Sequence, residues 1–214
     1  DQIDGSTITQ VTPQELTYTY GANFELTNAE ETQSSSIQTE DIFGNVTTTT
    51  YVNSGLNAQA MAKGLVRWDR LTVSSTYGAQ VDGSSIRQTS AQILTYTYGT
   101  HFELTGATEF QSSAIETTDI FGNVTTTTYV NSGLNAQAMA KGLVRWDRLT
   151  VSSTYGEQVD GSSIRQTSAQ ILTYTYGAHF ELTGATEFRS SRIETTDIFG
   201  NVTTTTYVNS GLNA

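Results

Sequence analysis

Apolar and polar residues alternate over short stretches of this chain, and one of these stretches returns unchanged. Residues 41–58 recur at 119–136 and again at 197–214, so that each return comes 78 residues after the last. Two looser relatives, 94–98 and 149–155, also begin with an aliphatic residue and Thr and end with Tyr. Because strand side chains point alternately to two faces, this alternation predicts β-strands. We therefore expect about three strand–turn units in each 78-residue copy.

The repeated stretch contains a turn signal of its own. A Gly-Asn pair stands between Ile-Phe and Val-Thr, a pattern that predicts a two-residue type II′ turn in a β-hairpin. This turn would place Phe43 opposite Val46 and Ile37 opposite Val52, with Ile42 on the other face. Both faces then carry apolar side chains, so the hairpin is expected to be partly buried on both sides. The predicted turn residues are Gly44, Asn45, Gly122, Asn123, Gly200 and Asn201.

One segment has the composition of a helix. Residues 134–141, Leu-Asn-Ala-Gln-Ala-Met-Ala-Lys, are followed by Gly142 in the position of a helix C-terminal cap. This predicts one short helix of about two turns in each copy.

The sequence predicts an all-β protein built from tandem 78-residue repeats. Stacked copies would form an elongated β-hairpin spiral or solenoid, and the alternative is a string of small β-sandwich modules. One copy is shorter than the others by 20 residues, and two frames describe the array. The copies are either 1–78, 79–156 and 157–214, or 1–58, 59–136 and 137–214. Divergence is concentrated in the first 40 residues, which hold the only proline, Pro13.

Composition and charge narrow the classes of partner. Only 36% of the residues are hydrophobic and 14% are charged, and the net charge is −11. A strongly acidic chain is an unsuitable ligand for nucleic acid, which requires a basic face. The chain has no cysteine and no apolar run of membrane-spanning length. We expect an extracellular or cell-surface bacterial protein without membrane insertion, whose targeting segment lies outside this sequence because Asp1 opens no signal peptide.

Two segments carry a family resemblance. Residues 118–129, Thr-Asp-Ile-Phe-Gly-Asn-Val-Thr-Thr-Thr-Thr-Tyr, and residues 146–156, beginning Trp-Asp-Arg-Leu-Thr-Val, resemble the YD repeat of bacterial Rhs-type surface and toxin proteins. The chain departs from that pattern at Thr118, where the family has Tyr, and in its 78-residue period. The resemblance implies a β-hairpin spiral on a cell surface and supplies no catalytic residue.

A basic and aromatic cluster is the candidate ligand site. Trp side chains flanked by Arg can stack on a sugar or bind an anionic polymer. The same residues can also serve as packing residues between repeats, and the sequence leaves both interpretations open. The candidate ligand-binding residues are Arg67, Trp68, Arg70, Arg145, Trp146 and Arg148.

Metal binding and catalysis have weaker sequence support. Asp82 and Asp160 lie in Asp-Gly-Ser turns and are the candidate Ca²⁺ ligands, although such residues are also ordinary turn residues. His101 and His179 have Asn23 at the equivalent position of the first copy, so a histidine-based catalytic site would be missing from one repeat. We therefore predict no enzyme activity and no obligatory cofactor.

These patterns favour a structural function. We expect a repeat region of an extracellular bacterial stalk or fibre-forming adhesin, with neighbouring repeats as partners and self-association through β-strand edges. The alternative is a binding module that recognises carbohydrate or another cell-surface partner through the Trp68 and Trp146 clusters.

Overall fold

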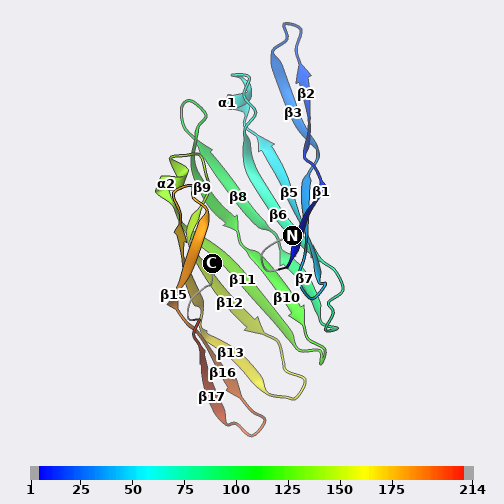
Figure 1. Ribbon diagram of the computed structural model, residues 1–214, viewed down its shortest axis with the longest axis vertical. Helices are drawn as coiled ribbons and strands as arrows, with labels where there is room; N and C mark the ends of the chain where they lie inside the picture. Colours follow the sequence, from blue (N-terminus) through cyan, green and yellow to red (C-terminus); the bar gives the residue numbers. More distant parts are fainter. Residues whose placement is uncertain (1–4, 210–214) are drawn as a thin grey trace. The chain divides into compact units, whose positions relative to one another are not determined.

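The structure is a computed structural model that describes residues 5–209. The predicted all-β class is confirmed, since strands make up nearly all of its regular structure (Figure 1). Its sequence favours strands because β-branched Thr, Val and Ile pack well on a pleated surface. The elements are β1 (Thr7–Thr12), β2 (Glu15–Tyr20), β3 (Leu26–Gln33), β4 (Ser35–Glu40), β5 (Val46–Leu56), α1 (Ala58–Met61), β6 (Trp68–Tyr77), β7 (Ser85–Ser90), β8 (Gln92–Tyr98), β9 (Leu104–Gln111), β10 (Ser113–Thr118), β11 (Val124–Leu134), α2 (Ala136–Met139), β12 (Trp146–Tyr155), β13 (Ser163–Ser168), β14 (Gln170–Tyr176), β15 (Leu182–Arg189), β16 (Ser191–Thr196) and β17 (Val202–Tyr207).

The chain forms two compact units, and neither is one contiguous repeat. Unit 1 combines the residues up to Val81 with Ala91–Gln111, and unit 2 combines Asp82–Ser90 with the residues from Ser112 onward. The chain therefore enters unit 2 at β7, returns to unit 1 for β8 and β9, and then enters unit 2 again at β10.

Each unit holds one six-stranded antiparallel sheet with the same strand order. In unit 1 the order is β1-β4-β5-β6-β8-β9, and in unit 2 it is β7-β10-β11-β12-β14-β15. Every strand of the six-stranded sheet of unit 1 has its equivalent in the six-stranded sheet of unit 2, 78 residues further along the chain, as with β6 and β12. In the frame that begins at residue 1, one copy supplies the first four strands of each sheet, and the next copy supplies the last two.

Two smaller sheets each correspond to a part of the six-stranded sheet. β13-β16-β17 in unit 2 form a three-stranded sheet equivalent to the first three strands of a six-stranded sheet. β2 and β3 in unit 1 form a hairpin equivalent to the last two strands, β8 and β9. What the small sheets lack, among the described residues, is a strand equivalent to β6.

The repeated hairpin exists, but the predicted type II′ turn and its register are wrong. Gly122 N–H donates to the Asp119 carbonyl (3.0 Å), and Asp119 N–H donates to the Asn123 carbonyl (3.0 Å). Gly122 is left-handed, with φ of +93°. These contacts define a three-residue loop with a glycine bulge. Its longer loop places Ile37 opposite Thr49 in the first copy instead of Val52.

The physical cause of this difference is an aspartate side chain. The Asp119 carboxylate accepts hydrogen bonds from Phe121 N–H, Asn123 N–H and the Asn123 side-chain amide, each at 2.9 Å. These bonds, the one from the Asn123 side chain first, hold the pKa of Asp119 below its ordinary value. The carboxylate thus fixes the wider loop, and Ile120 and Phe121 leave the strands and become exposed loop residues.

Replacing Gly122 with alanine is expected to destabilise unit 2 by about 1–2 kcal/mol, because an L-residue is strained in the left-handed region. A Cβ there would have only ordinary contact with Val159 (3.7 Å), so the cost is conformational rather than steric. Chemical denaturation measures the change. The control Gly122→Asn should lose less, since Asn tolerates this conformation, and an equal loss for both variants would contradict the argument.

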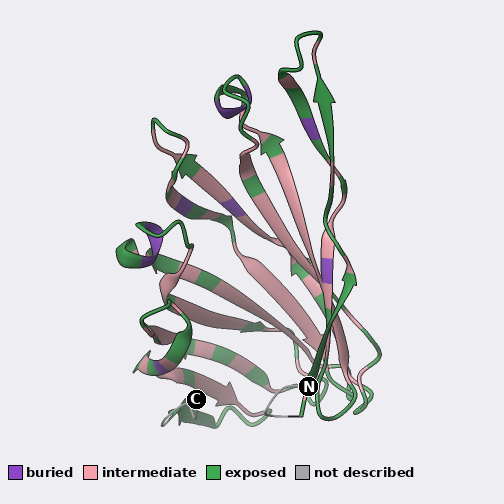
Figure 2. Ribbon diagram, turned by 45° about the horizontal axis from the view of Figure 1, so that its top comes forward, coloured by how far each residue is buried: buried purple, intermediate pink, exposed green. Residues whose placement is uncertain are grey.

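The interior of the protein is thin. Most strand residues are half-buried on both faces, as predicted, and Figure 2 shows few fully buried segments. No large side chain in the described residues is completely buried, so each sheet depends on its strand neighbours and on many partial contacts. The buried apolar residues are Ala29, Ala60, Met61, Leu94, Ala107, Ala138, Met139 and Ala185.

The predicted short helix is present and is one turn long. In α2 the Asn135 side chain caps the N-terminus by accepting from Ala138 N–H (2.9 Å), and Gly142 closes the segment with φ of +74°. Ala138 and Met139 are its buried residues. The helix is shorter than 134–141 because Leu134 remains in β11 and residues 140–142 form a turn.

Candidate functional site

In the frame that begins at residue 1, the contact of β6 with the hairpin β8–β9 connects consecutive copies. We call this contact, with its equivalent between β12 and β14–β15, the junction. β6 and β8 pair antiparallel, with Arg70 opposite Thr95, Leu71 opposite Leu94 and Thr72 opposite Ile93. Leu94 is the buried residue of this ladder, with only 8% of its surface exposed. β12 and β14 repeat the pairing.

A tyrosine hydroxyl adds a polar contact to the junction. Tyr98 Oη donates a hydrogen bond of 2.6 Å to the Trp68 carbonyl, and Tyr176 does the same to the Trp146 carbonyl. Burial is the main cause that raises the pKa of the Tyr98 hydroxyl above its ordinary value. The hydroxyl therefore stays protonated at neutral pH and remains a donor to the strand of the other copy.

The turn between β8 and β9 presents a strained backbone to β6. Gly99 N–H donates to the Glu103 carbonyl (2.9 Å), and Phe102 occupies the bulge position with φ of +61°. A glycine normally fills that position, since a bulky residue is strained there. Arg67 Nε donates to the Phe102 carbonyl at 3.0 Å. Phe24 in the β2–β3 turn has the same left-handed conformation, with φ of +62°, so the strain belongs to the turn sequence and not to the contact with Arg67.

The junction accounts for the contacts of the predicted ligand-binding arginines. Arg67 uses its guanidinium on the carbonyls of Phe102 and Val66, and Arg145 makes the equivalent contacts with Phe180 and Val144. The Arg70 guanidinium lies 5.3 Å from the centre of the Phe110 ring, and Arg148 lies 5.1 Å from the Phe188 ring. These are cation–π contacts across the junction.

The two tryptophans lie at the start of the junction strands. Trp68 is half-buried, pairs with Leu56, and offers its carbonyl to Tyr98. Trp146 has the same place in β12. The structure therefore brings the predicted cluster together at the junction, with Tyr98, Phe102 and Phe110 as members that the sequence reasoning missed. The recurring Tyr-Gly-x-x-Phe-Glu at 98–103 and 176–181 was the signal available for them.

A second contact lets the β2–β3 hairpin pack against the six-stranded sheet of unit 1. The Glu31 carboxylate accepts hydrogen bonds from the Asn53 side chain and Gln14, both at 2.7 Å, and from Ser34 at 2.6 Å. Burial acts to raise the pKa of Glu31, but these hydrogen bonds outweigh it and lower the pKa below 4.5. In unit 2, Glu187 likewise accepts from Asn209 N–H (3.0 Å).

Glu31→Gln is expected to weaken this packing at neutral pH and to make the stability of the protein less sensitive to acid. A carboxylate with a lowered pKa in the folded state stabilises the protein above its unfolded pKa, and this contribution is lost as the pH falls through the folded value. Denaturation at pH 7 and pH 3, followed by tryptophan fluorescence, should show a smaller difference for the variant than for the wild type. The exposed neighbour Glu30→Gln serves as the control, and an equal effect there would contradict the role of Glu31.

The candidate calcium residues take part in turns. Asp160 Oδ1 accepts from Ser162 N–H (2.9 Å) and Ser162 Oγ (2.7 Å), and Asp82 Oδ1 accepts from Ser84 N–H (2.9 Å). The Ser162 contacts, the side chain first, lower the pKa of Asp160. Within residues 5–209 no three His, Cys, Asp or Glu side chains are grouped closely enough to hold a metal ion.

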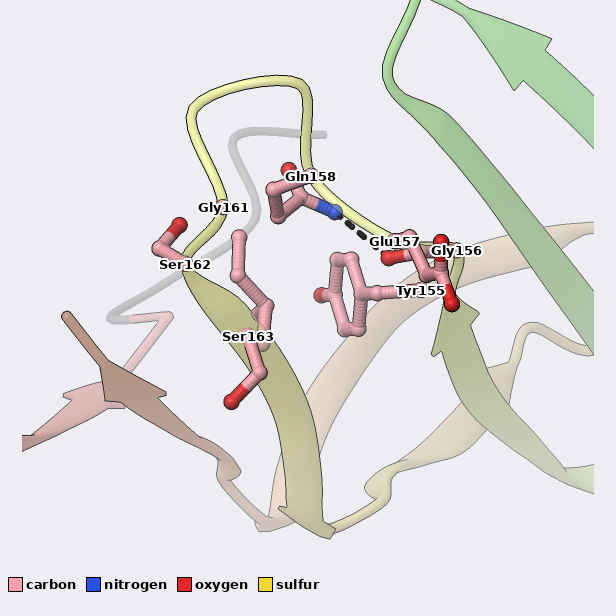
Figure 3. Close-up of a pocket in the computed structure, with 8 residues that line it drawn as sticks. Tyr155, Gly156, Glu157, Gln158, Gly161, Ser162 and Ser163 are labelled. Carbon is pink, nitrogen blue, oxygen red and sulfur yellow. Dashed lines mark hydrogen bonds between the residues drawn. The ribbon is translucent and has the colours of Figure 1, made fainter. Parts of the chain in front are cut away.

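An open hollow of about 480 Å³ lies beside the loop from β12 to β13 (Figure 3). Tyr155, Gln158 and Ser163 contribute to its lining, and Gln158 Nε2 donates to the Gly156 carbonyl at 2.9 Å. Burial raises the pKa of Tyr155. None of the predicted Arg or Trp residues lines this hollow, so it is separate from the junction.

Comparisons with known proteins add no relative to this description. No protein-family model matches the chain, and no curated protein or solved structure matches it either. In the part of the chain that the structure describes, no helix has the length and apolarity needed to span a membrane.

Proposed function

We propose that this chain is a structural repeat region of an extracellular bacterial stalk or fibre-forming adhesin. The observation that carries the proposal is that each six-stranded sheet combines strands of two consecutive copies in either frame; in the frame that begins at residue 1, these strands meet at the junction. Adjacent copies interlocked in this way separate only when a strand ladder breaks. Such coupling suits a protein whose task is to build length and bear load.

The packing of the small sheets favours a continuous β spiral or solenoid over separate sandwich modules. The β2–β3 hairpin contacts β5 and α1 in unit 1, and β13 and β16 contact β12 and β14 in unit 2. In the frame that begins at residue 1, the β12–β13 contact joins the second and third copies, whereas the contacts of the β2–β3 hairpin lie within the first copy. This arrangement agrees with the hairpin spirals that the YD-repeat resemblance implies, and the acidic, cysteine-free composition is compatible with a bacterial surface.

Single-molecule stretching of the chain from its two ends tests the load-bearing role. We expect distinct unfolding peaks in the wild type, because extension must break the junction ladders. The variant Leu94→Ala/Leu172→Ala should keep its β-structure and unfold at lower force. Smooth extension of the wild type without a force peak would contradict the proposal.

Recognition of carbohydrate or another cell-surface partner through Trp68 and Trp146 is the second candidate. Both tryptophans are half-buried, so part of each residue remains open for stacking on a sugar. A glycan array with the wild type and Trp146→Ala separates the two candidates. Loss of glycan binding by a folded variant favours the binding module, and loss of folding without any wild-type glycan binding favours packing at the junction.

A further inference from the structure

Unit 2 carries an arginine that unit 1 lacks at the equivalent position. Arg189 in β15 stands where β9 has Gln111, although the chain as a whole has a net charge of −11. We propose that Arg189, Arg148 and Phe188 form a binding surface for an acidic polysaccharide on the six-stranded sheet of unit 2. This inference rests on the second candidate function, carbohydrate recognition, and names the class of ligand and the residue that selects it.

The two arginines belong to one face of this sheet. Arg148 and Thr150 are two residues apart in β12, so their side chains point to the same face. Thr150 lies opposite Ile171 of β14, and Ile171 lies opposite Arg189 of β15. Residues that lie opposite each other in antiparallel strands share a face, so Arg148 and Arg189 lie on the same side of the sheet.

An exposed aromatic ring adjoins both arginines. The register of β14 and β15 shifts after Ile171, which makes Phe188 the extra residue of a bulge next to Arg189. The Arg148 guanidinium lies 5.1 Å from the centre of the Phe188 ring, and Phe188 is 63% exposed. A ring of this kind can stack on the apolar side of a sugar, while a neighbouring guanidinium pairs with the acid group of that sugar.

The positive charge of this face has no described counter-ion. Arg148 and Arg189 are exposed, and neither takes part in an ion pair within residues 5–209. The neighbouring carboxylate of Glu187 lies opposite Leu172 and therefore points to the other face. It accepts hydrogen bonds from two side chains of its own unit, each at 2.8 Å. Both guanidinium groups are therefore available to an anion from solution.

Hydroxyl groups around the arginines favour a sugar polymer over a nucleic acid. Thr150, Thr173 and Thr186 lie on the same face as Arg148, and a threonine hydroxyl both donates and accepts hydrogen bonds, as the hydroxyls of a sugar do. A nucleic acid requires several basic side chains to neutralise its phosphates. Two arginines on an acidic chain match the lower charge density of an acidic polysaccharide.

Unit 1 supplies a natural comparison. Arg70 lies 5.3 Å from the centre of the Phe110 ring, so the first arginine and the aromatic ring are kept. Gln111 takes the place of Arg189, and its side chain donates to the Ala91 carbonyl at 2.9 Å. We therefore expect unit 1, with one cation fewer on this face, to bind the same polymer more weakly than unit 2.

Calorimetric titration of the whole chain at low ionic strength with polygalacturonate and with dextran sulfate tests the proposal. The wild type should bind at least one of these acidic polymers more tightly than neutral dextran, and the polymer that binds shows whether carboxylate or sulfate is recognised. Arg189→Gln, which installs the residue of the second copy, should weaken binding about tenfold because one charge-assisted contact is lost. The reciprocal Gln111→Arg should create a second site in unit 1.

Arg192→Ala is the control for net charge. It also installs the residue of the second copy and removes one positive charge, but Arg192 lies in β16 of the three-stranded sheet, opposite Thr206. This variant should keep the affinity of the wild type. Equal losses for Arg192→Ala and Arg189→Gln would reveal attraction by overall charge alone and would overturn the proposal.

A wild type that binds neither acidic polymer, or that binds single-stranded DNA as tightly as the preferred polymer, would also overturn it. Retained binding of neutral glycans in such a protein would leave the second candidate function standing. None of these results would alter the force peaks of the chain, so failure here is distinguishable from failure of the load-bearing role.

Discussion

Truncation of Leu94 to alanine is expected to lower the free energy of unfolding of unit 1 by about 2–4 kcal/mol. Leu94 is among the largest of the buried side chains and lies opposite Leu71 in the junction ladder. Its removal costs the transfer free energy of the side chain and leaves a cavity that the surrounding residues can fill only in part. Chemical denaturation of the purified variant measures the loss.

The first copy supplies a matched control for this prediction. Leu16 holds the equivalent position in β2, but it has no β6-type strand beside it among the described residues and is less buried than Leu94. Leu16→Ala should therefore cost about 1 kcal/mol or less, because little additional apolar area is lost. Equal losses for the two variants would show that the junction does not bury Leu94 as described.

Proline at Thr72 should disrupt unit 1 and leave unit 2 largely intact. Thr72 lies in a central strand, opposite Val52 of β5 on one side and Ile93 of β8 on the other. Its N–H therefore faces a paired strand on either side of β6. Proline removes the donor and is unsuited to a central strand, at a cost of about 3 kcal/mol or more. Hydrogen exchange followed by mass spectrometry should show lost protection in 46–56, 68–77 and 92–111.

Thr150→Pro is the reciprocal variant, because Thr150 has the equivalent position in β12 of unit 2. It should expose 124–134, 146–155 and 170–189 to exchange and spare unit 1. Loss of protection throughout the chain in either variant would mean that the two units unfold as one, contrary to the division into two compact units.

Local features of the fold were accessible from the sequence. Alternation and Thr-rich runs identified the strands, and Gly142 marked the end of the helical segment. The turn at Gly44 was placed correctly but assigned the wrong type, because the Gly-Asn pair outweighed the Asp41 carboxylate three residues before Gly44. That one side chain widened the loop and shifted the pairing of the two strands by three residues, from Val52 to Thr49 opposite Ile37. A shift by an odd number of residues moves the side chains of one strand to the opposite face relative to those of its partner.

The order of strands was not accessible from the sequence. β1 pairs with β4 and β6 with β8, so each sheet omits a neighbouring element that belongs to another sheet. Such pairing is set by contacts between residues far apart in the chain, and near-identical copies give each strand several partners with the same local pattern. The Arg67–Arg70 cluster was recognised, but its partners Tyr98 and Phe102 became visible only when the pairing was known.

Disulfide trapping at the junction tests most directly whether the hairpin of one copy completes the sheet of the copy before it. The chain contains no cysteine, so an introduced pair has no competitor. Residues directly opposite in antiparallel strands have Cβ atoms about 4.5–5.5 Å apart, close to the separation that a disulfide requires. In the frame that begins at residue 1, Arg70 and Thr95 belong to consecutive copies and lie opposite each other, whereas Thr17 is the equivalent threonine of the copy that contains Arg70.

Under mild oxidation, Arg70→Cys/Thr95→Cys is predicted to form an intramolecular disulfide in monomeric protein, as measured by mass spectrometry of the digested chain. Arg70→Cys/Thr17→Cys is predicted to remain reduced under the same conditions. The reverse result, a disulfide to residue 17 and none to residue 95, would show that β6 pairs with the β2–β3 hairpin and not with the β8–β9 hairpin, and would contradict the junction.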